Sequence, residues 1–282
     1  MRLALWAALV GGAFVAFSLF SFWLAVRPPR IHVALEPREL RLAPEVVTIT
    51  TRDGLRLAGW LLPRPGAAAV VLLHGYPADK ADMLTLAAAL APEFTVLLYD
   101  QRYFGASEGH ATTIGHRERD DLSRALDLLA ARGVRRVGVF GFSLGGAVAL
   151  MTAAEDPRVA AVVAYAPFAD LATLGHDLYW WMGPARRPFV TTVRAWSRLF
   201  LGVDIARPSP AQAAPRLAIP VWLVHSRDDD QIPFSHAERL GAALARNPRA
   251  VVEAVDGPHG ALPDAFPARL ADFFRRALAE RS

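Results

Sequence analysis

The stretch GFSLGG, residues 141–146, decides the fold predicted for this chain. Its pattern G-x-S-x-G places Ser143 between an apolar run, RRVGVFG, and a helix-like run, LGGAVALMTAAE. A serine in a very tight strand-to-helix turn takes a strained backbone conformation, and bulky side chains two residues away on either side would clash. The helix N-terminus beneath the turn also favours negative charge. The stretch therefore predicts a nucleophilic serine at the carboxyl end of a strand.

Strand-like and helix-like runs alternate on both sides of this turn. The run AAVVLLH is short and fully apolar, as expected of a strand buried on both faces. The other strand-like runs are VVTITT, LRLAGWLL, TVLLYD, RVAAVVAY, PVWLVH and AVVEAV, and the other helix-like runs are ADMLTLAAALA, HRERDDLSRALDLLAARG, FSHAERLGAALAR and PARLADFFRRALAE. This alternation predicts an α/β fold with a mostly parallel central sheet and helices on both faces. Functional sites of such sheets lie at the carboxyl ends of the strands.

The chain divides into three predicted parts. Its 282 residues, of which 53% are hydrophobic, are enough for one large core. We expect that core in a domain over residues 46–282. The alternation breaks at residues 166–216, where aromatic residues and prolines predict a small helical cap. Residues 27–45 are rich in proline and charge, so we expect an irregular, extended linker there.

The first part, residues 1–26, is predicted to be a transmembrane anchor. From residue 3 to residue 26 the sequence LALWAALVGGAFVAFSLFSFWLAV carries no charge. As a helix this stretch would be about 36 Å long at 1.5 Å per residue, enough to cross the hydrocarbon core with some tilt. Trp23, followed by Arg27 and Arg30, suits the membrane interface.

Two alternatives to an anchor remain for this stretch. A cleaved signal peptide would have a shorter apolar run that ends in a cleavage site of the Ala-x-Ala type. No clear site of this type precedes RPPR, residues 27–30. A core helix of a soluble domain would carry a polar face, and this stretch has none. We therefore expect a single-pass membrane protein held by residues 3–26. The larger number of arginines after the apolar run favours a cytoplasmic position for the domain that follows.

Composition excludes several classes of partner. The net charge is +4 and the pI is about 9.9, but Lys80 is the only lysine and the arginines are scattered. Without a basic stripe interleaved with aromatics, the sequence predicts no binding of nucleic acid. The absence of cysteine excludes disulfides, thiolate metal sites and a cysteine nucleophile. No motif indicates a metal or an organic cofactor.

Two later stretches carry residues able to activate Ser143. A serine hydroxyl is a poor nucleophile until a base removes its proton. His259, in VDGPHGAL, follows the last predicted strand, so its loop should lie at the same carboxyl edge as Ser143. The stretch HSRDDDQIP, residues 225–233, ends the preceding strand, where a carboxylate that orients the histidine is expected. These residue types leave open which aspartate has that role among Asp228, Asp229 and Asp230.

The remaining histidines fit the role of base less well. His74 and His225 end strands ahead of their loops, whereas His176 lies in the predicted cap and His236 on a helix. His32, His110 and His116 precede the serine in the chain.

From about residue 46 onward the chain resembles the α/β-hydrolase superfamily, and within it the bacterial membrane-anchored esterase and serine-aminopeptidase-like group. The stretches that match in order are HGYPADK, YDQRYFGASEG, GFSLGGAVAL, HSRDDDQIP and GPHG. The family's acid motif is His-Gly-x-x-Asp-x-x-Val-Pro, and laid on residues 225–233 it places the acid on Asp229. This chain departs from the motif at Ser226 and Ile232.

The resemblance also implies where a developing oxyanion would bind. In the family two backbone N–H groups bind it, one from the residue after the nucleophile and one from the loop after the third strand. These positions correspond to Leu144 and Tyr76. The family pattern D-x-R-x-x-G-x-S implies a bracing role for Asp100 and Arg102.

The resemblance and the residues together predict a serine hydrolase. We expect cleavage of a carboxylic ester or thioester through an acyl-enzyme, without a cofactor. The expected substrate is a small acyl compound, and a lipid-derived one is among the candidates. An amidase or peptidase, or a perhydrolase, would use the same three residues. A non-catalytic, membrane-tethered scaffold on the same fold is the alternative of a different class. The aromatic residues of the cap would line an acyl pocket, contact lipid or form the core of the cap itself.

Overall fold

The computed structural model describes residues 1–279, so the last three residues of the predicted domain, 280–282, lie outside the described part. Its centre is an eight-stranded sheet in the order β1-β2-β4-β3-β5-β6-β7-β8. The strands are β1 (Glu45–Thr50), β2 (Arg56–Leu62), β3 (Ala69–Leu73), β4 (Thr95–Tyr99), β5 (Val137–Phe142), β6 (Val159–Tyr165), β7 (Val221–Ser226) and β8 (Ala250–Val255). Every predicted strand forms.

The sheet is mostly parallel, as predicted. Strands β1 and β2 form an antiparallel hairpin at one edge, and β2 pairs antiparallel with β4. All other neighbours are parallel. Every residue of β3 and of β4 is buried. Two buried faces explain why these strands read as continuous apolar runs and not as alternating ones.

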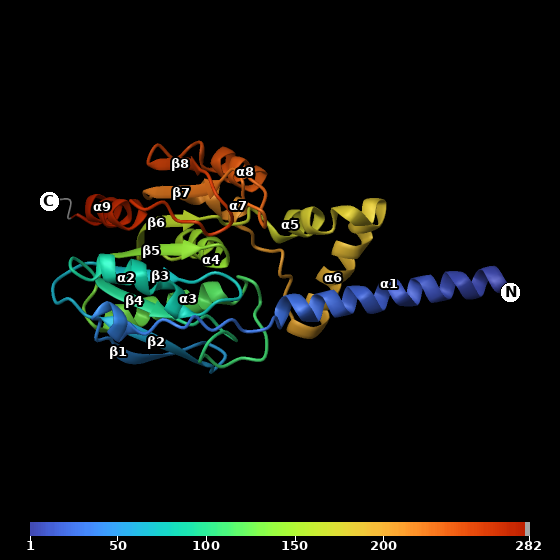
Figure 1. Cartoon of the computed structure of the whole chain (residues 1–282), viewed down its shortest axis with the longest axis horizontal. Coiled ribbons are helices and arrows are strands. Elements are labelled where there is room, and N and C mark those ends of the chain that lie inside the picture. The colour runs from blue at the N-terminus through green and yellow to red at the C-terminus, as the bar shows by residue number, and fades with distance from the viewer. Residues whose placement is uncertain (280–282) are drawn as a thin grey trace.

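Helices cover both faces of the sheet (Figure 1). The helices are α2 (Leu84–Leu90), α3 (Glu118–Ala131), α4 (Leu144–Ala153), α7 (Pro210–Ala213), α8 (Ser235–Leu244) and α9 (Phe266–Leu278). Apolar side chains of α3, α4, α7 and α8 share one buried cluster with the sheet, and those of α2 and α9 share another. The predicted α/β-hydrolase type of architecture, with two layers of helices around the sheet, is confirmed.

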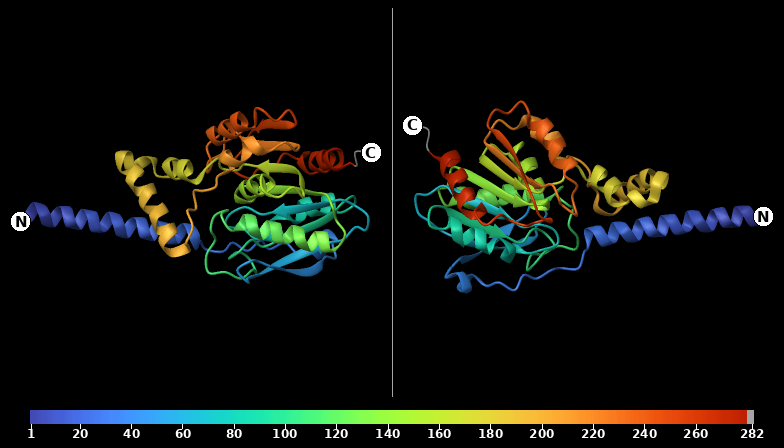
Figure 2. Two further views of the ribbon diagram at one scale, coloured as in Figure 1. Left: turned by 180° about the vertical axis from the view of Figure 1, so that it is seen from behind. Right: turned by 45° about the horizontal axis from the view of Figure 1, so that its top comes forward.

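Between β6 and α7 the chain leaves the sheet and forms three helical pieces. These are α5 (Leu171–Leu178), the 3₁₀ segment η3 (Trp180–Ala185) and α6 (Arg186–Leu201). They project beyond the ends of the strands as an arm, which we call the cap below (Figures 1 and 2). Helix α7 follows them and contacts α4 and α8, back on the layer that covers the sheet.

Helix α1 (Arg2–Val26) extends away from the sheet on the side of this arm (Figures 1 and 2). Among residues 1–279 it is the one helix long and apolar enough to cross a membrane, although a signal sequence has the same properties. Its outer part is exposed, but near its carboxyl end it packs against α6. The segment that follows is mostly irregular, with one 3₁₀ turn at Pro37–Leu40.

Buried charges brace the loops at the carboxyl ends of the strands. Arg102 donates to both carboxylate oxygens of Asp121, at 2.7 and 2.6 Å, and also to Asp53, whose pKa it lowers to about 2. Asp100 accepts hydrogen bonds from the backbone N–H and the ammonium group of Lys80, each at 2.7 Å. Asp121 and Asp100 thus each accept hydrogen bonds from a buried cation, Arg102 and Lys80 respectively. These contacts fit the bracing role implied for Asp100 and Arg102.

The Arg102–Asp121 pair gives a test of this bracing. Removing one partner of a buried ion pair leaves a charge without compensation and typically costs about 3–5 kcal/mol. We expect Arg102→Met to lower the free energy of unfolding by about that amount, measured by denaturant titration in detergent. The double variant Arg102→Met/Asp121→Leu should recover most of the loss, because neither charge is then buried alone. Equal losses in both variants would contradict this explanation.

Candidate active site

Ser143 occupies a strained turn between β5 and α4. Its φ of 52° and ψ of −113° lie outside the regions that L-residues commonly adopt, and its N–H donates to the Tyr165 carbonyl at 2.8 Å. A Cβ on Gly141 would lie 2.1 Å from the Gly145 carbonyl oxygen, and one on Gly145 would lie 2.5 Å from that of Leu73. The glycines on either side therefore allow the start of α4 to approach β5 and β3 closely.

His259 and Asp229 meet at the carboxyl ends of β8 and β7. The His259 ring donates from Nδ1 to Asp229 Oδ2 at 2.7 Å, and the Asp229 side chain is fully buried. The other carboxylate oxygen accepts from the backbone N–H groups of Gln231 and Ile232 at 2.9 and 2.7 Å. The carboxylate is thus held from two sides, and the remaining ring nitrogen of His259, Nε2, is available as a proton acceptor.

The two aspartates beside Asp229 bind the backbone of the histidine loop. Asp230 accepts from the N–H of His259 at 3.1 Å, and Asp228 accepts from the N–H of Gly257 at 3.4 Å. Of the three adjacent carboxylates, only that of Asp229 contacts the His259 ring among the described residues. The outer two fix the loop that carries the ring.

A second histidine also contacts Asp229. His225 is fully buried, donates from Nε2 to the Ile232 carbonyl at 2.9 Å, and has the same nitrogen 3.3 Å from Asp229 Oδ2. Sequence reasoning assigned His225 no contact with the acid. The sequence did carry a signal for this contact, because His225 begins the acid motif. A residue four positions before Asp229 can contact it across the tight loop.

These contacts determine the charge of Asp229. Burial alone would raise its pKa, but hydrogen bonds from His225, His259 and two backbone N–H groups outweigh burial and hold the pKa well below its usual range. The contribution of this carboxylate to stability is therefore complete above its unfolded-state pKa of about 3.9, and it is lost as the pH falls from there through the lower folded-state pKa.

Phe142 connects the serine to the histidine loop. Its ring packs on the His259 ring, with centroids 4.9 Å apart. A Cβ on Gly75 would lie 2.6 Å from the Phe142 ring, and one on Gly260 would lie 2.8 Å from it. The loops after β3 and β8 thus close on the residue that precedes Ser143. Among residues 1–279 the Ser143 hydroxyl makes no hydrogen bond with His259, and such contacts often tighten only when substrate binds.

The backbone N–H groups of Tyr76, in the loop after β3, and of Leu144, at the start of α4, lie next to Ser143. Neither donates a hydrogen bond within the part of the chain that the structure describes. Both residues line the same cavity as Ser143. Two unused donors beside a serine hydroxyl can bind an oxygen that becomes negatively charged.

The cavity beside Ser143 has a volume of about 280 Å³ and a mainly apolar wall. Its wall comes from α1, the start of α4, the cap helices and the loops that follow β3, β4, β6 and β7. The lining residues are Ser21, Ala25, Tyr76, Ile114, Ser143, Leu144, Phe168, Leu171, Leu174, Gly175, Leu178, Tyr179, Val193, Ile205, Gln231 and Ile232. Apolar walls with few polar groups suit an acyl chain. Sequence reasoning missed the contribution of α1, for which the sequence carries no signal.

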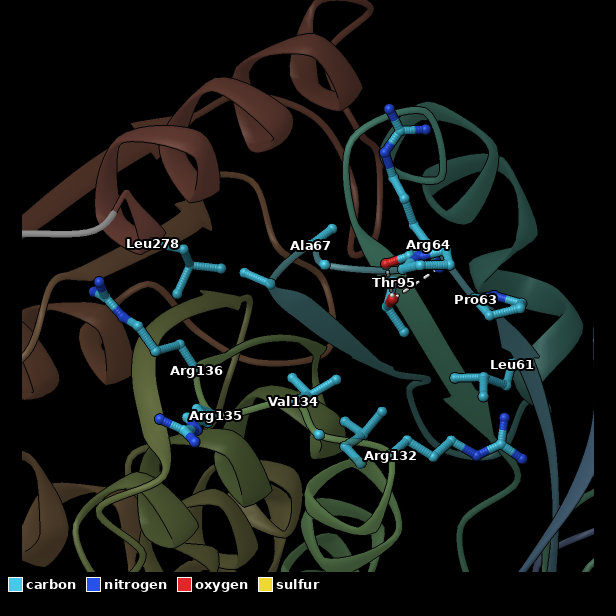
Figure 3. Close-up of a pocket in the computed structure, with 15 residues that line it drawn as sticks. Leu61, Pro63, Arg64, Ala67, Thr95, Arg132, Val134, Arg135, Arg136 and Leu278 are labelled. Atoms are coloured by element: carbon cyan, nitrogen blue, oxygen red, sulfur yellow. Dashed lines mark hydrogen bonds between the residues drawn. The ribbon is translucent and has the colours of Figure 1, made fainter.

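A larger cavity, about 750 Å³, lies elsewhere (Figure 3). It is lined by Arg64, Arg132, Arg135 and Arg136 together with residues at the starts of β3 and β4. This cavity therefore adjoins the amino ends of the parallel strands. Ser143 follows the carboxyl end of β5, at the opposite edge of the sheet. Among residues 1–279 no group of three or more His, Asp or Glu side chains is arranged so that it could hold a metal ion.

Two further histidines have structural contacts. His74 donates from Nδ1 to the Gly75 carbonyl at 2.8 Å and accepts from the Gln101 N–H at 2.9 Å. His236 accepts from the Ala169 N–H and donates to Asp177 at 3.0 Å, which ties α5 to α8. Burial lowers the pKa of both rings, so both favour the neutral form.

Comparison with known proteins identifies relatives of this chain. A family model described as the alpha/beta hydrolase fold matches residues 68–195. An uncharacterized protein of Mycobacterium tuberculosis is 31% identical over 242 residues, which cover 83% of this chain and 79% of that protein.

Solved structures resemble the chain over most of its length. A Pyrococcus furiosus esterase superposes with a TM-score of 0.73 at 26% identity and covers 90% of this chain and 99% of the esterase. A structure described as a membrane phospholipase A, a bacterial virulence factor, superposes with a TM-score of 0.63 over 99% of this chain and 97% of its own. At 17% identity, the second likeness concerns the fold alone.

The close approach of α4 to β3 gives a test of the serine turn. We expect Gly145→Ala to lower the free energy of unfolding by about 3 kcal/mol, because its Cβ overlaps the Leu73 carbonyl and forces the turn to shift. Gly241→Ala in α8 is the matched control, since its Cβ has 3.4 Å to the nearest atom. That variant should be about 0.5–1 kcal/mol more stable than wild type. Denaturant titrations that ranked the two variants equally would argue against the tight turn.

Proposed function

The chain belongs to the α/β-hydrolase superfamily, and from this premise we propose that it is a serine hydrolase that cleaves carboxylic esters or thioesters. The observation that carries the proposal is the strained Ser143 turn, beside two unused N–H donors and next to the buried His259–Asp229 pair. The likeness to an esterase supports ester cleavage. The apolar cavity supports an acyl group as the part of the substrate that is bound.

The proposed reaction has two halves. The Ser143 oxygen attacks the carbonyl carbon while His259 Nε2 accepts the hydroxyl proton. The same proton then passes to the leaving alcohol or thiol, the bond to the leaving group breaks, and an acyl-enzyme remains. Water attacks this ester in the second half, again giving its proton to His259, and the acid leaves as Ser143 regains its hydrogen.

Asp229 keeps the histidine in the productive state. By accepting from Nδ1 it fixes the tautomer whose Nε2 is free to accept a proton, and it stabilises the imidazolium that follows. The N–H groups of Tyr76 and Leu144 donate to the carbonyl oxygen as it becomes an oxyanion. One such donor is typically worth about 3 kcal/mol in the transition state.

We further propose that α1 is a retained single-pass anchor. Its length and apolar composition support a span, and the Arg27 guanidinium lies 4.3 Å from the Trp23 ring centroid, as residues of a membrane interface do. The arginines after residue 26 support a cytoplasmic position for the hydrolase domain.

Covalent labelling tests the proposed function. We expect a fluorophosphonate probe to label full-length wild type and not Ser143→Ala, because only an activated serine reacts. A panel of matched acyl esters, thioesters and amides should then show turnover of the first two. Absence of labelling in folded wild type would remove the basis of the proposal, and faster turnover of the amides would make the protein an amidase.

The three adjacent aspartates give a matched series. Asp229→Asn should lower kcat by about 10⁴-fold, since an amide favours the wrong tautomer of His259. Asp228→Asn and Asp230→Asn should lower kcat far less, because their carboxylates bind only the backbone of the loop. The measurement is ester turnover at pH 7. A larger loss in either outer variant would reassign the acid.

A further inference from the structure

Helix α1 is part of the cavity beside Ser143. Two residues from its last two turns, Ser21 and Ala25, line that cavity together with Ser143 and Leu144. Ser21 is buried and Ala25 is half-buried. A helix that only tethered the domain to a membrane would have no reason to contact the nucleophile's pocket.

The carboxyl end of α1 is docked on the domain by hydrogen bonds. The last carbonyls of a helix have no partner within the helix. Here the Tyr76 hydroxyl donates to the Ala25 carbonyl at 3.1 Å, and the Thr112 N–H donates to the Val26 carbonyl at 3.0 Å. Tyr76 also supplies one of the proposed oxyanion donors, so the same residue contacts the anchor and adjoins Ser143.

The cap helix α6 packs along α1. The ring of Phe189 contacts those of Phe14 and Phe17, with centroids 5.9 and 5.3 Å away. The Trp196 indole donates to the buried Ser18 hydroxyl at 2.9 Å. The two serines of the apolar stretch, Ser18 and Ser21, thus face the protein, as do polar residues of membrane helices that pack on a partner.

These contacts extend far along the helix. Val26 lies twelve positions after Phe14, which corresponds to about 18 Å of helix at 1.5 Å per residue. Crossing the hydrocarbon core, about 30 Å thick, takes roughly 20 residues. If α1 spans the core, its contacts with α6 lie at the depth of the acyl chains.

The surface of the cap matches that position. Several of its large apolar side chains are exposed, Trp180 by 71% and Trp181 by 58%, and Leu199 and Phe200 are also exposed. They continue the exposed apolar surface of α1, with Trp181 in ring contact with Phe17. An exposed apolar surface of this kind is typical of a membrane contact.

On the basis of the proposed hydrolase and its anchor, we propose that the last two turns of α1 form the acyl-binding wall of the active site, and that the substrate is an acyl ester of a lipid from the leaflet that holds the cap. The acyl chain lies between α1 and the cap helices with its carbonyl at Ser143. The anchor then determines which chain lengths bind, in addition to where the enzyme resides.

Two alanines of α1 provide the test. Ala25 lines the cavity, and Ala16 is exposed nine residues earlier on the same helix. Full-length protein in detergent is assayed with p-nitrophenyl acetate and p-nitrophenyl decanoate. We expect Ala25→Leu to lower the ratio of kcat/KM for decanoate to that for acetate at least tenfold, because the added atoms fill the acyl space. Ala16→Leu should keep the wild-type ratio.

An unchanged ratio in Ala25→Leu would overturn the acyl wall. If that variant does not fold, Ala25→Val adds less volume and should lower the ratio in the same direction. Labelling of Ser143 by the fluorophosphonate separates the two proposals. Labelled protein with an unchanged ratio contradicts only the acyl wall, and unlabelled wild type contradicts the hydrolase and the wall together.

The source of the substrate is tested in vesicles of phosphatidylcholine and phosphatidylglycerol that contain the full-length protein. A fluorogenic acyl-ester lipid is placed either in the same vesicles or in separate ones. We expect hydrolysis at least tenfold faster in the same vesicles. Equal rates in the two arrangements would show that the ester is taken from solution, and would overturn the membrane as its source.

Discussion

The turn at Ser143 is the constraint on which the rest of the site depends. A residue with positive φ between β5 and α4 is stable only if the helix lies almost in contact with the sheet, and glycines at 141 and 145 permit that contact. Once the turn is in place, the start of α4 presents an unused N–H next to the hydroxyl. The loops after β3 and β8 then close on the Phe142 ring, which brings Tyr76 and His259 to the same edge.

The second element of the site is a loop that divides work among three acids. Adjacent carboxylates repel one another, so a run of three needs separate partners. The loop supplies them, because the middle side chain points to the ring of His259 and the outer two point to backbone N–H groups of the facing loop. Each carboxylate therefore has a hydrogen-bond donor, and His259 is held through both its ring Nδ1 and its backbone N–H.

The helix that would hold this protein in a membrane, α1, also lines the cavity beside Ser143. Docking of the Ala25 and Val26 carbonyls on the domain leaves little freedom between anchor and site. The cap packs on the same helix and shares its apolar surface. If α1 is the anchor that we propose, one group of contacts sets both the position of the domain relative to the bilayer and the shape of the cavity beside Ser143, which would link localisation to specificity.

The sequence by itself determined the strands, the helices, the parallel sheet and the strained serine turn, because these follow from local periodicity and from residues within a few positions of one another. It also indicated His259, since a loop after the last strand must lie at the same edge as Ser143. The residue types left open which aspartate contacts the His259 ring, and only the resemblance to the family motif favoured Asp229. Tertiary structure directs the Asp229 side chain to that ring, because neighbours in a loop differ only in the direction of their side chains. The contacts of His225 with the acid and of Ala25 with the pocket of Ser143 were likewise settled by packing. The second of these joins residues more than a hundred positions apart, and no local pattern in the chain encodes which surfaces of two distant segments will be buried together.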